Sequence, residues 1–113
     1  MIEIEFNAYG ETHKARFEKS EYANNRNLYV GVATWDEEYQ YWEPWCDLTV
    51  NLDIPLDGDA AFLDTNGCTP EIINALTDKG YVINTGMTRS SGFCTYPLVR
   101  FTKEFLDGTY GEN

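Results

Sequence analysis

Apolar and polar residues alternate near the N-terminus of this chain, and this alternation is typical of strands in an antiparallel sheet. Near the N-terminus, Ile2, Ile4 and Phe6 alternate with polar residues. A period of two places the three apolar side chains on one face of a strand. After a turn at residues 8–11, residues 12–22 resume the alternation, and residues 28–35 are rich in β-branched and aromatic residues. Three antiparallel strands are therefore predicted.

A fourth strand is predicted within residues 39–52, most strongly over residues 46–52. Pro44 cannot donate a hydrogen bond to a neighbouring strand, so the first part of this segment belongs at a sheet edge or a bulge. The simplest arrangement of the four strands is an antiparallel meander.

The second half of the chain contains shorter apolar runs. Residues 60–63, 81–83 and 93–101 predict further strands. Between the last two of these runs, residues 85–92 are predicted to form a flexible loop. Residues 104–106 are predicted to add a turn.

One segment has the pattern of a helix, over residues 70–80. Thr69 suits the N-cap, Pro70 the first helical position, and Gly80 the end of the helix. A chain of 113 residues has room for one domain of ordinary size. We therefore expect an α+β fold in a single domain, 1–113: an antiparallel sheet of about five to six strands with one main helix packed on it.

Negative charge is concentrated in the middle of the chain. The 52 residues between Arg26 and Lys79 contain no lysine or arginine and eleven carboxylates, and the other residues hold eight acids and eight bases. The formal charge of -11 therefore belongs to this region. Such a charge repels polyanions, so direct binding of nucleic acid or an anionic membrane is disfavoured and a basic protein surface is favoured.

Aromatic residues are interleaved with these carboxylates. All three tryptophans lie in the same acidic region. Large aromatic side chains supply the binding energy that exposed ion pairs lack. If extended, Glu3 and Glu5, like the pairs at 36/38 and 57/59, would form rows of regularly spaced charge. Rows of this kind could imitate the phosphates of nucleic acid.

The sequence does not assemble a convincing catalytic or metal site. His13 is the only histidine. The three cysteines, Cys46, Cys68 and Cys94, are odd in number and include no CxxC pair. Reduced, partly buried thiols are expected. The acids around residues 57–66 do not have the spacing of an EF-hand calcium loop. We expect no enzymatic activity, no catalytic residue, no metal and no cofactor.

The N-terminal residues 1–7 lack the basic start and continuous apolar run of a secretory signal. No segment approaches the roughly 20 apolar residues that a membrane span needs. A cytoplasmic location is predicted.

Three segments, residues 48–52, 61–66 and 91–98, are similar to a family of small uncharacterised proteins, a domain of unknown function, carried on conjugative elements and phages of gut bacteria. The similarity covers about residues 28–102. The family has no established catalytic residues to place on this chain. The resemblance implies a mobile-element setting, in which small acidic inhibitors of host restriction or CRISPR systems are common.

The leading hypothesis is an acidic anti-defence protein, of the anti-CRISPR or anti-restriction type, that blocks a basic nucleic-acid-binding protein of the host by DNA mimicry. The predicted partner-binding residues are Trp35, Asp36, Glu37, Glu38, Tyr39, Trp42, Glu43, Asp57 and Asp59. One alternative is an accessory interaction protein without mimicry, which binds through a patch near Arg89. A small hydrolase with paired carboxylates is the other. The sequence leaves monomer and dimer open.

Overall fold

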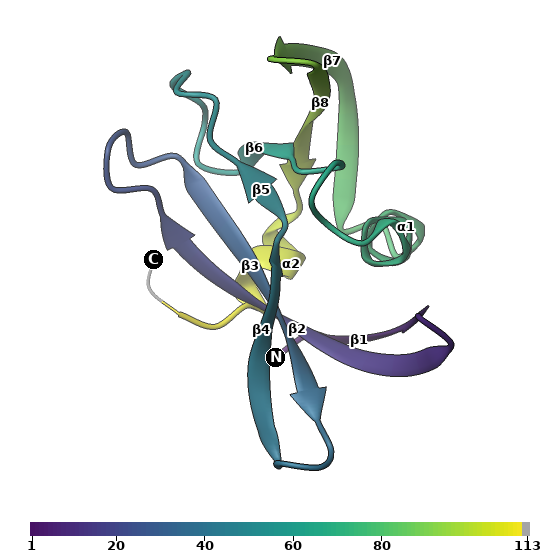
Figure 1. Ribbon diagram of the computed structural model, residues 1–113. Coiled ribbons are helices and arrows are strands. Elements are labelled where there is room, and N and C mark those ends of the chain that lie inside the picture. Colours follow the sequence, from purple (N-terminus) through teal and green to yellow (C-terminus); the bar gives the residue numbers. More distant parts are fainter. Residues whose placement is uncertain (112–113) are drawn as a thin grey trace.

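The computed structural model describes residues 1–111 and contains two antiparallel sheets of four strands each (Figure 1). In the first sheet the spatial order follows the chain: β1 (Glu3–Ala8), β2 (Glu11–Glu21), β3 (Leu28–Asp36) and β4 (Tyr41–Asp47). The predicted meander is therefore confirmed. The second sheet has the spatial order β5 (Thr49–Val50), β6 (Ala60–Leu63), β8 (Cys94–Phe101) and β7 (Val82–Ser91). Two short helices, α1 (Pro70–Asp78) and α2 (Lys103–Asp107), complete the elements of residues 1–111.

The expected α+β fold, one sheet of about five to six strands with a main helix packed on it, is wrong. The structure is mostly β, with 52% of its residues in strands and 13% in helices. The chain leaves the first sheet at Leu48, whose N–H donates to the carbonyl of Val30 at 2.9 Å and whose carbonyl accepts from the N–H of Asp64 at 2.9 Å. The strand predicted over residues 46–52 is thus divided between β4 and β5. Alternation along a chain does not show which strands pair, so it could not reveal this division.

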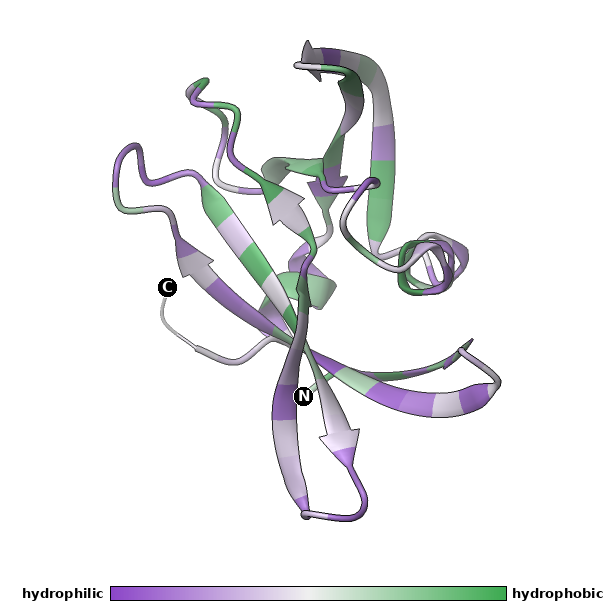
Figure 2. Ribbon diagram, in the orientation of Figure 1, coloured by the Kyte–Doolittle hydropathy of each residue, from purple (hydrophilic) through white to green (hydrophobic). Residues whose placement is uncertain are grey.

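In β1 the first sheet buries one face and exposes the other, as the alternation predicts, whereas β3 also buries Gly31 and Ala33 on its outer face. Along β1 every second residue is buried, beginning with Ile4. Along β3, Leu28, Val30 and Val32 belong to the core, and Figure 2 shows the alternating hydrophobic positions on this strand. Because β4 is an edge strand, Pro44 occupies the edge position expected of it.

Helix α1 forms where predicted, and Thr69 is its N-cap residue as predicted, but the Thr69 side chain makes no capping hydrogen bond. Ile72 and Leu76 are buried, and Gly80, with φ of +76°, follows the helix in the left-handed conformation that suits glycine. The hydroxyl of Thr69 does not cap the helix and instead accepts a hydrogen bond from Trp45 Nε1 at 2.9 Å. Thr69 therefore connects the start of α1 to β4 of the first sheet.

Helix α2 joins the two sheets through one aromatic side chain. Phe105 is fully buried, and its ring centroid lies 5.2 Å from that of Phe17 in β2 and 5.2 Å from that of Phe101 in β8. Tyr81 adds a third ring at 5.8 Å. Thr102 caps the helix by accepting a hydrogen bond from the N–H of Phe105. The predicted turn at residues 104–106 is thus a helix that packs in the core.

The flexible loop predicted over residues 85–92 is also wrong. Strand β7 continues through it to Ser91, with an irregularity in pairing between Asn84 and Thr88. Every residue of β7 except Val82 is exposed. Strands β7 and β8 form a hairpin that extends away from the first sheet (Figure 1). We call this hairpin the β7–β8 arm.

Candidate functional site

The β3–β4 hairpin ends in a tight turn held by several hydrogen bonds. The carboxylate of Asp36 accepts from the N–H groups of Glu38 and Tyr39, at 2.9 and 3.0 Å. The N–H of Gln40 donates to the carbonyl of Asp36 at 2.8 Å, and its side chain donates to the carbonyl of Glu37 at 2.7 Å. Gln40 has a φ of +57°, which closes the turn. The backbone of this turn is therefore well defined, and Asp36 is part of its framework.

The structure brings together seven of the nine predicted partner-binding residues at this turn, which we call the hairpin tip (residues 35–43). These seven are Trp35, Asp36, Glu37, Glu38, Tyr39, Trp42 and Glu43. Glu37 and Glu38 are exposed, whereas Asp36 and Glu43 are half-buried. No ion pair of residues 1–111 includes any carboxylate of the tip. The tip therefore carries four carboxylates with no basic side chain paired to them.

Aromatic side chains surround these carboxylates. Trp35 and Trp42 are partners across β3 and β4, with ring centroids 5.4 Å apart, and both are half-buried. Tyr39 and Tyr41 are exposed, Tyr39 by 71%. The hydroxyl of Tyr41 donates to Glu43 Oε2 at 3.2 Å, and this bond raises the pKa of Tyr41. Tyr39 is the free aromatic contact at the tip, and the tryptophan pair forms its base.

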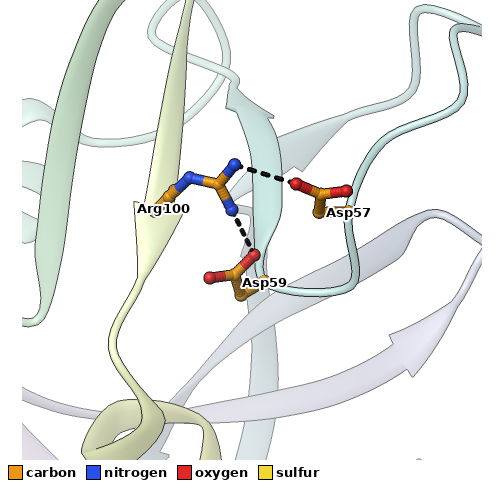
Figure 3. A network of polar contacts seen from close by, with 3 residues as sticks. All are labelled: Asp57, Asp59 and Arg100. Atoms are coloured by element: carbon orange, nitrogen blue, oxygen red, sulfur yellow. Dashed lines mark hydrogen bonds and ion pairs between the residues drawn. The ribbon is translucent and has the colours of Figure 1, made fainter.

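Asp57 and Asp59 do not join the hairpin tip. They lie just before β6, and both bind Arg100 of β8 (Figure 3). Arg100 Nη2 lies 2.9 Å from Asp57 Oδ2, and Arg100 Nη1 lies 2.6 Å from Asp59 Oδ1. The two carboxylates raise the pKa of Arg100. Since one guanidinium neutralises much of their charge, these two predicted contact residues are better explained as a structural bridge between β8 and the loop before β6.

Only one of the three predicted carboxylate rows lies on a strand. Glu3 and Glu5 both point to the exposed face of β1. In contrast, Asp36 ends β3 and Glu38 lies in the turn, while Asp57 and Asp59 converge on Arg100. Of these three pairs, only Glu3 and Glu5 on β1 therefore keep the regular spacing of a strand.

Sequence reasoning missed a groove on the outer face of the first sheet. Its floor contains Gly31 and Ala33, and its walls include Tyr29, Trp42 and Tyr110. The groove has a volume of about 350 Å³. A Cβ on residue 31 would collide with the hydroxyl of Tyr29, so the glycine leaves room for the Tyr29 side chain in its present position. The signal in the sequence was the pair of small residues at alternate positions of an otherwise bulky strand.

Arg16 lies beside this groove between two aromatic rings. Its guanidinium carbon is 4.4 Å from the centroid of Trp42 and 4.5 Å from that of Tyr110. Arg16 Nε is buried without a hydrogen-bond partner. Cation–π contacts of this kind hold the side chain against the sheet. Arg16 thereby supports the base of the hairpin tip through Trp42.

His13 packs against aromatic rings, and two of the three cysteines lie in contact with each other. The His13 ring stacks on Phe6 at 5.2 Å and lies 5.0 Å from the ring of Trp45. The thiols of Cys46 and Cys68 are in contact, at 2.6 Å between the sulfurs. Within residues 1–111, no group of three or more His, Cys, Asp or Glu side chains is placed to hold a metal ion. In the same range, no helix has the length and apolar character of a membrane span.

The fold and this surface define a small two-sheet β protein with an acidic, aromatic-containing hairpin tip. A family model described as a domain of unknown function, DUF4313, matches residues 17–110. The chain belongs to this family. The resemblance to a family of unknown function is thus confirmed, over a longer range than residues 28–102. Comparisons with curated proteins and with solved structures found no match.

Proposed function

We propose that this protein is an acidic inhibitor that binds the basic nucleic-acid-binding surface of a host defence protein. In this proposal it acts in the bacterial cytoplasm, as an anti-CRISPR or anti-restriction protein of a conjugative element or phage. The observation that carries the proposal is the hairpin tip, where four carboxylates without an ion pair share one hairpin with exposed and half-buried aromatic side chains. A groove built to hold phosphates presents lysine and arginine, which are complementary to such a surface.

The hairpin tip would imitate the density of negative charge on nucleic acid rather than the regular spacing of its phosphates. Because the tip is a turn, its carboxylates do not repeat at the spacing of a strand. Exposed ion pairs contribute only about 0.2–1 kcal/mol each, so carboxylates alone would bind weakly. Tyr39, which projects from the same turn, is suited to add an aromatic anchor. The net charge of -11 would also accelerate encounter with a basic partner at low salt.

The test is competition for DNA. Labelled duplex is bound to each of a panel of purified restriction and CRISPR effector nucleases, and this protein is titrated against the complex. We expect displacement of DNA from at least one nuclease, weakening as ionic strength rises. Replacing Glu37 and Glu38 together by glutamine should weaken inhibition about 2- to 30-fold, which corresponds to two exposed ion pairs. Asp36 is left unchanged because it holds the turn.

The matched control replaces Glu71 by glutamine and Asp78 by asparagine, two exposed carboxylates of α1. It changes the net charge by the same amount and leaves the tip intact, so inhibition should be nearly unaffected. Equal weakening by both double variants would show that only total charge matters and would contradict a role for the tip. If the protein displaces DNA from none of the nucleases tested, the proposal is rejected for that panel.

The β7–β8 arm favours the second candidate, an accessory interaction protein without mimicry. Three of the four sheet edges are poorly suited to further pairing: β1 has exposed glutamates, β4 contains Pro44 and two acids, and β5 has two residues. Strand β7 has ten residues without a carboxylate or a proline, and it exposes Ile83, Met87 and Arg89. A partner strand that carries acidic residues would complement this edge.

Capture from bacterial lysate with identification by mass spectrometry separates the two candidates. Arg89→Glu should remove an acidic partner of the arm, whereas replacing Glu37 and Glu38 by glutamine should leave it in place. The identified partner should then protect the amides of β7 from hydrogen exchange. A partner that is lost only when the glutamates are replaced would instead support the hairpin tip.

A further inference from the structure

Two of the three cysteines are in contact although they lie 22 positions apart in sequence. Cys46 belongs to β4, and Cys68 lies in the segment just before α1. Their sulfur atoms are 2.6 Å apart. The spacing in sequence did not predict this contact, which arises because β4 and the segment before α1 pack together.

Neighbouring hydrogen bonds hold both cysteines in place independently of the thiols. Next to Cys46, Trp45 Nε1 donates to the hydroxyl of Thr69, which is itself adjacent to Cys68. The N–H of Cys68 donates to the carbonyl of Asp64 at 2.9 Å, which fixes the turn that precedes α1. The two sulfurs are therefore pre-positioned, and joining them requires no rearrangement of separate elements.

The two thiols differ in exposure and in acidity. Cys46 is half-buried, whereas Cys68 is only 4% exposed. Contact with Cys68 lowers the pKa of Cys46, whereas contact with Cys46, together with burial, raises the pKa of Cys68. An accessible thiol with thiolate character reacts first with an oxidant, and a buried neighbour then resolves the product.

We propose that Cys46 and Cys68 are a redox-active dithiol that a small disulfide oxidant converts into an intramolecular disulfide. The Cys46 thiolate attacks one sulfur of oxidised glutathione, which forms a mixed disulfide and releases one glutathione thiolate. Cys68 then loses its proton and attacks Cys46 Sγ, which displaces the second glutathione. Two thiols become one disulfide, and the two electrons pass to the oxidant as two reduced glutathione molecules. In a reducing compartment the pair remains a dithiol.

The bond would fasten the base of the acidic hairpin to the second half of the chain. It closes a loop within the unfolded chain, which lowers the entropy of unfolding. From the loop length we expect the oxidised protein to melt on the order of 10 °C higher than the reduced protein. A cross-link of this kind stabilises β4, the edge strand that carries part of the hairpin tip.

The test uses the 113-residue protein in mixtures of reduced and oxidised glutathione. After acid quenching, unfolding and alkylation, intact mass and peptide mapping show which thiols remain. As oxidised glutathione increases, we expect Cys46 and Cys68 to lose alkylation together and to appear as one linked peptide pair, with Cys94 outside it. The Cys94→Ser variant should give the same result, which excludes a contribution from the third thiol.

Two single variants test the order of the steps. Cys68→Ser should accumulate a glutathione adduct on Cys46, because no resolving thiol remains. Cys46→Ser should leave the buried Cys68 largely unmodified. If both thiols of the unsubstituted protein stay alkylatable at every glutathione ratio, or if the disulfide joins Cys94 or a second molecule, the proposal is overturned. The measurement on the unsubstituted protein decides this even if a variant folds poorly.

Discussion

Replacement of Phe105 by alanine tests whether α2 is a structural element of the core. The side chain is fully buried, and three aromatic rings lie within 5.8 Å of it by centroid distance. Truncation of a buried phenylalanine to alanine costs about 3–5 kcal/mol in free energy of unfolding. Each aromatic pair adds roughly 0.5–1.5 kcal/mol beyond burial. We therefore expect a loss in the upper half of that range, about 4–5 kcal/mol.

Urea unfolding followed by far-ultraviolet circular dichroism measures this loss. With a urea dependence of about 2 kcal/mol per molar, the midpoint should fall by about 2 M. A loss of this size is a large share of the 5–15 kcal/mol typical of a domain, so the variant should remain folded only in dilute urea. The variant Phe93→Ala is the control, since that side chain is fully exposed at the turn of the β7–β8 arm and its loss should cost less than about 0.5 kcal/mol.

A result in which both variants lose the same small amount of stability would refute the reasoning. It would mean that α2 does not dock between Phe17 and Phe101, and that the two sheets are held together without it. A five-residue helix has little stability of its own, so its presence depends on this docking.

Two further predictions concern charge. Burial and the hydrogen bond to Asp47 raise the pKa of Tyr29 above its usual value, so the folded state holds this proton more tightly than the unfolded state. The raised pKa contributes fully to the free energy of unfolding below about pH 10, and this contribution is lost as pH rises further. In urea titrations at several alkaline pH values, the free energy of unfolding of Tyr29→Phe should therefore fall less steeply with pH than that of the unsubstituted protein. Equal pH dependence of the two proteins would contradict the assignment. Replacing Asp57 and Asp59 by asparagine should release Arg100 but leave inhibition in the DNA competition assay nearly unchanged, and a loss as large as that of the tip variant would return both residues to the contact surface.

Local patterns predicted the individual elements well. The alternation over residues 2–22 and 28–35 corresponds to β1, β2 and β3, and the Pro70 and Gly80 signals enclose α1. These predictions succeeded because side-chain period and cap preference act between near neighbours in sequence. Two failed predictions concern strand pairing, which local patterns do not show: one apolar run divides at Leu48 between two sheets, and residues 85–91 continue β7 by pairing with β8.

The candidate site shows the same contrast. The seven residues at the hairpin tip could be grouped from sequence because one hairpin carries them all. The ion pairs of Asp57 and Asp59 could not be predicted from sequence, since their partner Arg100 is more than 40 residues away in the chain. The contact between Cys46 and Cys68 and the groove over Gly31 also require the packed structure.

Local sequence patterns indicated β1, β2, β3 and α1, the apolar faces of these elements, and the concentration of negative charge in the middle of the chain, but not the extent of β7 or the division between β4 and β5. Tertiary structure alone decided that there are two sheets, that Phe105 joins them, and which carboxylates are left unpaired. The difference arises from the separation in sequence between the residues that interact. Backbone preference and alternation depend on residues a few positions apart, whereas strand pairing, ion pairing and burial depend on which distant segments the folded chain brings into contact.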